Sequence, residues 1–508
     1  MATSLSLPPF NYFVINFFTF TFFFIFLYKK LSSQKVKKYF FLYGWLFGFG
    51  YFLTNLYWIS ISLSFDKNFK FLIPITIILI PAFLAIFYGL VSYLFLILKT
   101  KKITNSFLIF SLIFSILEFI RGSFLTGFPW NLIAYSFLNQ LEIISIISII
   151  GTYGFNLFCI SLFSCPALLI LRESNKEVIV FISLIICLSI FYLYGFQYKK
   201  IFNSSDEITY NYKIRAIGSN ISLERFYSSN NPVSIIEELI KISKPNLDEK
   251  TIFIWPEGIL PDISQEELVD YKWLFENKFN QNHILAMGIN SQIIIDNSSK
   301  YFNTFSIYDN ELNLINSYSK IKLVPFGEYL PFENFLSIIG LKSITNNYQS
   351  YSKGKKRKII EIKRKNFSIK ILPLICYEII YSGEISKEND FDLIINISED
   401  GWFGKSIGPK QHFAHSIFRS IESGKYIIRS ANNGTSAIIN PIGIIEKSLE
   451  LNDNGYIDLE KKRNIQPTVF SKFGNKIFGL IILLYIFLIF STSFSFSLNR
   501  KKSNFKNK

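Results

Sequence analysis

The amino-acid sequence predicts a polytopic α-helical membrane domain followed by one water-facing domain in which strands and helices alternate. Residues 10–196 and 477–496 are almost continuously apolar, whereas residues 205–470 have the mixed composition of a soluble domain. Lys and Arg residues are concentrated after every second apolar segment, as in proteins that cross a membrane repeatedly. We therefore expect a multi-pass membrane protein with a single large extramembrane domain of the α/β class.

About seven apolar runs approach or exceed the roughly 20 residues that a helix needs to cross a bilayer core. They cover residues 10–28, 39–58, 71–98, 104–120, 142–171, 178–196 and 477–496. The first six form a membrane domain over residues 1–200, and the seventh is a C-terminal span followed by a basic tail over 497–508. A secretory signal peptide is not expected, because no positive charge precedes the first run and that run is too long.

The basic residues predict the orientation of these spans. Those that follow the first, third, fifth and seventh runs are Lys29, Lys30, Lys35, Lys37, Lys38, Lys99, Lys101, Lys102, Arg172, Lys176, Arg500, Lys501, Lys502, Lys506 and Lys508. The alternate loops hold only Lys67, Lys70 and Arg121. Since short basic loops stay in the cytoplasm, residues 205–470 are expected on the outer side. The formal charge of +16 is thus mainly a topology signal, and no nucleic-acid partner is expected.

Residues 205–470 contain short apolar strands separated by polar helical stretches. Strands are expected over 251–255, 284–288, 368–375 and 392–397, a helix over 403–424, and a hairpin over 427–445. This alternation indicates an α/β or layered α+β domain with its sheet between helices, and functional residues then gather at the strand ends. An apolar stretch over 332–341 and a polar loop over 346–358 predict a flap close to the membrane.

Cys376 is the one cysteine outside a membrane-length apolar run, because Cys159, Cys165 and Cys187 all lie within such runs. It ends the strand 368–375, while Glu257 follows the strand 251–255. Thiol chemistry on a carbonyl carbon needs a base that takes the thiol proton and a positive group that faces the oxyanion. Glu257 and Lys320 could supply these two groups.

The residues alone leave other interpretations open. Cys376 is equally consistent with a small buried residue and with a nucleophile, and a glutamate after a strand is usually solvated. His412 and His415 lie three positions apart on the expected helix, and His412 could serve a Cys–His hydrolase. Two histidines with a distant cysteine lack the close spacing of zinc ligands, so no metal is expected.

Several motifs resemble those of the nitrilase (carbon–nitrogen hydrolase) superfamily. Glu257 in Trp-Pro-Glu, Lys320, and Cys376 in Cys-Tyr-Glu resemble its Glu-Lys-Cys signature. Longer motifs resemble its membrane-bound branch, the apolipoprotein N-acyltransferases. They are LVPFGEYLP at 323–331, DGWFG at 400–404, GPKQH at 408–412, RSANNG at 429–434, TGFPWNL at 126–132 and Tyr-Ser at 135–136. The resemblance extends over nearly the whole chain.

This resemblance implies a fold and a set of residue roles. The extramembrane domain would be a nitrilase-like αββα sandwich. Glu257 would be the general base, Lys320 would stabilise the oxyanion, and Cys376 would accept the acyl group. Glu328, Tyr377 and Glu378 would support the site, and no diffusible cofactor is implied. We also expect Trp130, Trp402 and Phe403 to contact lipid, although aromatic residues are common at any membrane interface.

Three positions depart from the family pattern. Gly258 stands where Thr or Ser is common, and Glu399 stands where Asn is common. Residues 6–10 resemble the segment after the family's first helix, so we expect either that this span is missing here or that the start of the chain was assigned downstream. None of these departures affects the three residues with proposed chemical roles, so they bear on the fine geometry of the site.

The expected activity is therefore acyl transfer at the outer face of a bacterial inner membrane. The resemblance implies a phospholipid donor, a thioester intermediate on Cys376, and as acceptor the N-terminal diacylglyceryl cysteine of an apolipoprotein, the last step of lipoprotein biosynthesis. A membrane-tethered amidase that passes the acyl group to water is the alternative with the same three residues. A transporter or scaffold is disfavoured, because the first six spans contain few charges.

Overall fold

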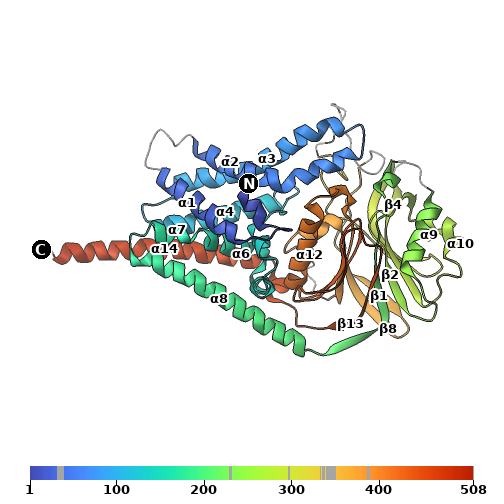
Figure 1. Ribbon diagram of the computed structural model, residues 1–508. Coiled ribbons are helices and arrows are strands. Elements are labelled where there is room, and N and C mark those ends of the chain that lie inside the picture. Colours follow the sequence, from blue (N-terminus) through green and yellow to red (C-terminus); the bar gives the residue numbers. More distant parts are fainter. Residues whose placement is uncertain are drawn as a thin grey trace.

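The computed structural model describes residues 1–506 apart from 31–38, 228–230, 296–297, 332, 334–337, 339–349 and 386–389. A bundle of membrane helices lies beside a domain built on two β-sheets (Figure 1). The chain begins in the bundle, forms the two-sheet domain, and returns along the bundle in the last helix, α14. The fold class predicted from the sequence, a helical membrane domain plus a layered α/β domain, is confirmed.

The bundle is built from long apolar helices joined by short helical turns. Its elements are α1 (Val14–Lys30), α2 (Phe40–Leu56), η3 (Tyr57–Ser64), η4 (Lys70–Leu72), α3 (Ile73–Leu98), α4 (Ile103–Ser123), α5 (Leu141–Ile144), α6 (Ile147–Ser164), α7 (Pro166–Ile170), α8 (Asn175–Ser204) and α14 (Lys476–Lys506). Within the described residues, six helical stretches are long and apolar enough to cross a membrane. They match every predicted span except the first, which corresponds to the 17-residue α1 and stays a prediction.

The predicted run 142–171 is one continuous apolar segment, but the chain folds there as α5, α6 and α7. The path bends at Gly151, which has a φ of +68° inside α6. A side chain at this position would meet the ring of Phe470, 2.0 Å from the ideal Cβ position. The bend therefore depends on a residue more than 300 positions away, which hydropathy does not reveal.

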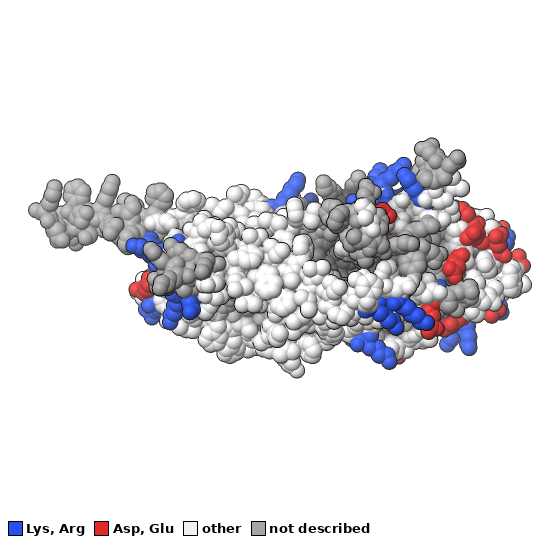
Figure 2. Space-filling model, turned by 90° about the horizontal axis from the view of Figure 1, so that it is seen from above, with Lys and Arg blue, Asp and Glu red and all other residues white. Residues whose placement is uncertain are grey.

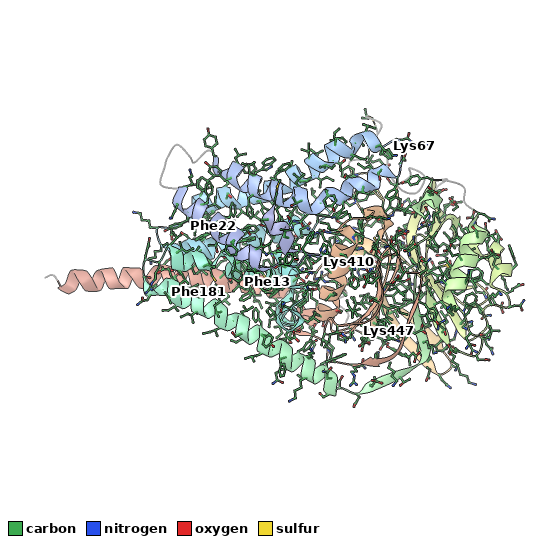
Figure 3. All side chains as sticks on the ribbon, in the orientation of Figure 1. Phe13, Phe22, Lys67, Phe181, Lys410 and Lys447 are labelled. Carbon is green, nitrogen blue, oxygen red and sulfur yellow. The ribbon has the colours of Figure 1, made fainter. Side chains whose placement is uncertain are left out.

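Burial divides the bundle into inner and outer helices. In the most apolar stretches of α4 and α6, 83% of the residues are buried, against 6% in α8 and α14. The outer helices thus present apolar side chains to their surroundings, as lipid-facing helices do. On α1 the side chain of Phe22 is 63% exposed (Figure 3). On the face seen in Figure 2, charged residues gather at the two ends of the molecule and are sparse between them, as expected of a protein embedded in a membrane.

The two sheets of the extramembrane domain lie face to face. The first sheet runs in the order β13-β1-β2-β4-β5-β6, with β3 paired to β4, and the second in the order β12-β11-β10-β9-β8-β7. The strands of the first sheet are β1 (Glu207–Gly218), β2 (Thr251–Ile254), β3 (Leu260–Ser264), β4 (His283–Ile295), β5 (Ser298–Tyr308), β6 (Leu314–Ser319) and β13 (Gly455–Arg463). Those of the second are β7 (Ile360–Arg364), β8 (Phe367–Ile375), β9 (Leu393–Glu399), β10 (Tyr426–Asn432), β11 (Ser436–Ile439) and β12 (Ile445–Leu449).

Helices cover both outer faces, which completes an αββα sandwich. Helices α9 (Pro232–Ser243) and α10 (Lys272–Phe275) cover the first sheet, and α12 (Gly408–Ser423) covers the second. One apolar core fills the space between the sheets. The outer face of the second sheet belongs to a different core, which continues through α12 into the membrane helices. The two domains are therefore joined by this second core, whereas the core between the sheets belongs to the two-sheet domain alone.

Directional polar contacts hold α12 against the bundle. The amide oxygen of Gln411 accepts hydrogen bonds from the indole N–H groups of Trp130 (2.9 Å) and Trp58 (3.2 Å). His415 Nδ1 shares a hydrogen bond of 2.8 Å with the Tyr135 hydroxyl. Every residue of α12 except Lys410 is buried. Such contacts require a defined geometry, so they set the orientation of the two-sheet domain relative to the bundle.

Candidate active site

The ends of three strands bring the predicted site residues together. Glu257 lies just beyond β2, Lys320 directly follows β6, and Cys376 directly follows β8. Strands β2 and β4 are parallel in the first sheet, and β8, β9 and β10 are parallel in the second. Since the carboxyl ends of these strands meet at one end of the sandwich, residues far apart in the sequence become neighbours there.

Lys320 lies between two carboxylates in the interior. Its Nζ is 3.1 Å from Glu257 Oε1 and 2.9 Å from Glu328 Oε1. The lysine is 1% exposed and each glutamate 6%. Burial acts to lower the pKa of Lys320, but the charges of Glu257 and Glu328 outweigh it and raise that pKa well above its ordinary value. The ammonium therefore stays charged, as a group that stabilises an oxyanion must.

Asn303 on β5 joins the two glutamates and was not predicted from the sequence. Its side-chain N–H group donates to Glu257 Oε1 (2.7 Å) and to Glu328 Oε1 (2.8 Å). The second oxygen of Glu257 accepts the backbone N–H of Glu399 at 3.0 Å. Both oxygens of Glu257 are thus held by donors, which orients the carboxylate precisely. Asn303 lies within a strand, and no local motif marks it.

Cys376 lies at a sharp turn between β8 and the short helix η10 (Cys376–Ile380), with a φ of +46°. Burial raises the pKa of its thiol well above the ordinary value, and the negative charge of Glu257 raises it further, while Lys320 acts in the opposite sense. The two side chains whose charges act most strongly on the thiol are thus the predicted partners, Glu257 and Lys320. A neutral thiol at rest means that its proton must be taken by a base during reaction.

Glu378 ties the segment that carries Cys376 to the segment that carries Lys320. Its carboxylate accepts hydrogen bonds from the Tyr318 hydroxyl (2.7 Å), the Ile321 backbone N–H (3.0 Å) and the Ile375 backbone N–H (2.9 Å). Tyr318 and Ile321 lie close to Lys320 in the sequence, and Ile375 directly precedes Cys376. Glu378 therefore acts on the site through the backbone, whereas Glu328 contacts the lysine directly.

A second polar cluster lies next to the nucleophile. Asp400 bonds to His412 Nδ1 (2.9 Å) and to Arg429 (2.7 Å), and accepts the Ser398 hydroxyl at 2.7 Å. Burial lowers the pKa of His412, so the ring is neutral near pH 7. The Nδ1 atom of His412 is bonded to Asp400, and the charge of Glu257 acts on the Cys376 thiol. The role of Glu257 as the base stays a prediction.

The two departures at Gly258 and Glu399 have structural explanations. Gly258 has a φ of +56°, which favours glycine. The Glu399 carboxylate bonds to Arg225 and to the side-chain N–H group of Asn432. Its charge is therefore paired, and its backbone N–H holds the base. Because this N–H belongs to the backbone, a glutamate at position 399 in place of Asn keeps the hydrogen bond that orients Glu257.

Comparison with known proteins gives one family model for each half of the chain and relatives that match nearly all of it. Residues 1–165 match the model of the apolipoprotein N-acyltransferase N-terminal domain, and residues 254–460 match that of the carbon-nitrogen hydrolase family. An apolipoprotein N-acyltransferase of Rickettsia prowazekii is 33% identical over 489 residues, which cover 94% of each chain. One of Rhodopseudomonas palustris is 29% identical over 462 residues, covering 88% of this chain and 84% of the relative.

The chain belongs to the apolipoprotein N-acyltransferase family.

Solved structures similar to this family member cover about half of the chain. A mutant of an amidase from Nesterenkonia sp. AN1 aligns with a TM-score of 0.34 and 12% identity, covering 49% of this chain and 92% of the amidase. A nitrilase-superfamily protein of Saccharomyces cerevisiae aligns with a TM-score of 0.33 and 18% identity, covering 50% and 90%.

The segment 126–132 of this N-acyltransferase family member lies against the site. Tyr377 and Tyr381 donate from their hydroxyl groups to the Gly127 carbonyl (3.2 Å) and the Thr126 carbonyl (2.9 Å). The neighbouring Trp130 is 2% exposed and stacks on His412, with ring centroids 5.3 Å apart. Trp130 thus packs inside the junction between the domains, and its predicted role in lipid contact stays a prediction.

Trp402 and Phe403, the other predicted lipid contacts, are partly exposed and lie near η3 of the membrane domain. Phe403 packs on Trp58 at 4.8 Å, and Trp402 packs on Phe65 at 6.0 Å between ring centroids. Trp402 and Phe403 are therefore more accessible candidates for lipid contact than Trp130. Most of the predicted apolar stretch 332–341, and the start of the predicted loop 346–358, lie outside the described residues.

Proposed function

We propose that this protein, a membrane-bound acyltransferase, moves a fatty acyl group from a phospholipid to the N-terminal diacylglyceryl cysteine of an apolipoprotein through a thioester on Cys376. The observation that carries the proposal is the buried group of Glu257, Lys320 and Cys376 beside a segment of the membrane domain. A base, a permanent positive charge and a thiol are the three groups that thiol-based acyl transfer needs.

In the first half of the reaction, Glu257 takes the proton of Cys376 as the sulfur attacks the ester carbonyl of the phospholipid. The oxygen of the tetrahedral intermediate becomes negative, and the Lys320 ammonium stabilises it. When the intermediate collapses, the ester C–O bond breaks and the departing oxygen takes the proton from Glu257. The products are a lysophospholipid and the Cys376 thioester.

In the second half, the α-amino group of the acceptor attacks the thioester carbonyl. Glu257 takes a proton from the attacking nitrogen, the C–S bond breaks, and the proton passes to the sulfur. The result is an amide on the acceptor and a free Cys376 thiol. Donor and acceptor bind in turn at one site, which gives ping-pong kinetics.

The membrane anchoring suits such substrates. Acyl chains cost about 0.8 kcal/mol per methylene group to transfer into water. A site adjoining the membrane domain lets these chains stay in lipid while the ester reaches the thiol. We place the protein in the inner membrane with the two-sheet domain on the periplasmic side, in agreement with the basic loops at the opposite helix ends.

A thioester-trapping experiment tests the proposal. Full-length protein in phospholipid vesicles should acquire the mass of one acyl group on Cys376, and adding a diacylglyceryl-cysteine peptide should discharge it as N-acylated peptide. Cys376→Ala should acquire none, whereas Cys187→Ser, in the half-buried cysteine of α8, should behave as wild type. Glu257→Gln should slow thioester formation by about 10²- to 10⁴-fold, the usual contribution of a general base.

Two outcomes would contradict the proposal. Release of free fatty acid with no acylated peptide would favour the amidase-type hydrolase, which uses the same three residues with water as the acceptor. Full activity of Cys376→Ala would reject the mechanism altogether.

A further inference from the structure

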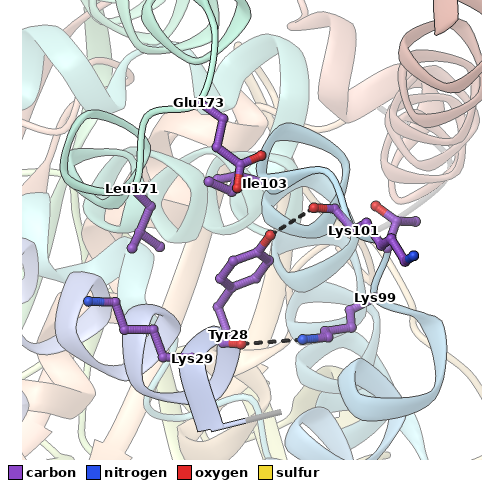
Figure 4. Close-up of a pocket in the computed structure, with 8 residues that line it drawn as sticks. Tyr28, Lys29, Lys99, Lys101, Ile103, Leu171 and Glu173 are labelled. Atoms are coloured by element: carbon purple, nitrogen blue, oxygen red, sulfur yellow. Dashed lines mark hydrogen bonds between the residues drawn. The ribbon is translucent and has the colours of Figure 1, made fainter. Parts of the chain in front are cut away.

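A basic cavity lies among the helix ends that carry the lysine-rich loops, within the membrane domain rather than the two-sheet domain. It has a volume of about 420 Å³. The end of α1, the link between α3 and α4, and the segment after α7 line it, and it is open to the surroundings (Figure 4). This volume lies within the range of small-molecule sites. Nothing in the proposed acyl transfer uses the cavity.

The charge lining the cavity is predominantly positive. Lys29, Lys99 and Lys101 line it, and Glu173 is the one acidic residue among its lining residues. It also adjoins the N-terminus of α4, where the first backbone N–H groups of a helix lack intrahelical acceptors. Three lysines against Glu173 favour an anionic ligand. The Glu177 carboxylate already accepts the Thr104 hydroxyl in the first turn of α4 at 2.7 Å, so the lysines carry this preference rather than the helix N-terminus.

Hydrogen bonds fix the frame of the cavity. Lys99 Nζ donates to the Tyr28 carbonyl at 3.3 Å, and the Tyr28 hydroxyl donates to the Lys101 carbonyl at 2.9 Å (Figure 4). An ammonium has three N–H bonds, so Lys99 keeps donors for a ligand after this contact. These two bonds join the end of α1 to the link between α3 and α4.

The remaining walls indicate which anion fits. Ile103 is buried and Leu171 half-buried, and both line the cavity together with the lysines. The cavity lies at the ends of membrane helices, at the level where lipid headgroups meet apolar chains. Basic pockets between membrane helices at this level suit anionic lipid headgroups. A free phosphate would satisfy the lysines but not the apolar wall.

We propose that this cavity binds the phosphate group of an anionic phospholipid, with its acyl chains along the apolar surface of the neighbouring helices. The bound lipid would join the ends of α1, α3 and α4. This is a second lipid site, separate from the donor site at Cys376 and at the other end of the bundle.

Native mass spectrometry of the full-length protein in detergent tests this proposal. Phosphatidylglycerol should be retained more strongly than phosphatidylcholine, which carries no net charge. The Lys99→Gln/Lys101→Gln variant should bind phosphatidylglycerol about 25-fold more weakly, at about fivefold per lysine. The Lys99→Arg/Lys101→Arg variant keeps both charges and should bind within about twofold of wild type, which separates loss of charge from loss of fold.

The matched control is Lys410→Gln/Lys447→Gln, which removes the same charge from the two-sheet domain and should not change binding. The proposal would be overturned if the Lys99→Gln/Lys101→Gln and Lys410→Gln/Lys447→Gln variants lost phosphatidylglycerol binding equally. It would also be overturned if the wild-type protein retained phosphatidylglycerol and phosphatidylcholine equally. Displacement of phosphatidylglycerol by millimolar inorganic phosphate would assign the cavity to free phosphate and overturn the lipid assignment. Resistance to that displacement would support it.

Discussion

At the scale of single residues, the site depends on how the oxygens of Glu257 are held. Lys320, Asn303 and the Glu399 backbone each donate to this carboxylate. A carboxylate with both oxygens bonded cannot rotate freely, so its lone pairs keep one direction relative to the thiol. Effective positioning of this kind accounts for a large part of many rate accelerations. The carboxylate of Glu257, the proposed base, is thus oriented before substrate arrives.

Asn303 offers a test of this positioning role. Asn303→Ala removes the N–H group that spans Glu257 and Glu328, and should lower kcat by about 10- to 100-fold while KM stays close to wild type. It should also destabilise the fold by about 1–3 kcal/mol, since two buried oxygens each lose a donor. The measurements are acyl-transfer kinetics and thermal unfolding. Asn316→Ala on the neighbouring strand β6 is the matched control, and an equal loss of kcat there would contradict the role.

The buried histidines make stability depend on pH. Burial lowers the pKa of His412 and, more strongly, that of His415. As the pH falls through the unfolded-state value near 6.5, the unfolded chain gains protons that the folded protein does not take up. Stability should therefore be complete above about pH 7 and decline below it. Thermal midpoints measured from pH 8 to 5.5 should fall, and His415→Gln should reduce the slope of that decline.

At the scale of elements, α12 links the sheet that carries Cys376 to the membrane helices. All of its residues except Lys410 are buried, so it is an internal layer. Arg419 and Glu422 lie on this helix and bond to Thr152 of α6 at 2.6 Å and 2.5 Å. Buried ionic groups cost free energy when unpaired, which makes these contacts specific for one orientation of the domains.

Gln411 should be the most sensitive polar position of this helix. Gln411→Leu leaves the indole N–H groups of Trp58 and Trp130 without their acceptor, at a cost of about 1–3 kcal/mol for each buried donor. We expect the thermal midpoint in detergent to fall by several degrees. Lys410→Gln, on the neighbouring exposed residue, should leave it unchanged. A midpoint unaltered by Gln411→Leu would show that these bonds contribute little.

Elements also show what sequence patterns predict and what they miss. Glu257 and Cys376 became candidates because each ends a short apolar run, a local feature of a buried strand, and the resemblance to the nitrilase superfamily implied their roles. Asn303 lies inside β5, and its function arises only because β6 places Lys320 beside it. Arg419 and Glu422 follow the pattern of a surface helix face, yet both are buried against another domain. Such contacts depend on tertiary structure, which periodicity does not encode.

At the scale of the whole molecule, the basic ends of α1 and α3 lie together with the end of α7. Lys29, Lys99 and Lys101 line one cavity, and Lys102 donates to the Thr492 carbonyl of α14 at 2.9 Å. The first, third and seventh predicted spans therefore end on the same side. This arrangement agrees with the orientation predicted from the loops.

Labelling of single cysteines on intact cells tests this orientation. In a background without the four native cysteines, Lys447→Cys on β12 should react with a membrane-impermeant maleimide once the outer membrane is permeabilised. Lys176→Cys should react only after the inner membrane is broken. Both lysines are exposed, so burial does not explain a difference between them. Labelling of Lys176→Cys in intact cells would contradict the proposed orientation.

The shared core of the two domains has a consequence for how this protein could be used or could evolve. The outer face of the second sheet, with Leu372, Leu374 and Ile394, is packed into the same interior as the membrane helices. Cutting the chain between the domains would expose that face to water, so the two-sheet half should not survive as a free soluble enzyme. The thiol is instead held at a constant height relative to the bilayer. Under the proposed function, only carbonyl groups and amines that lipid carries to the depth of Cys376 would reach it.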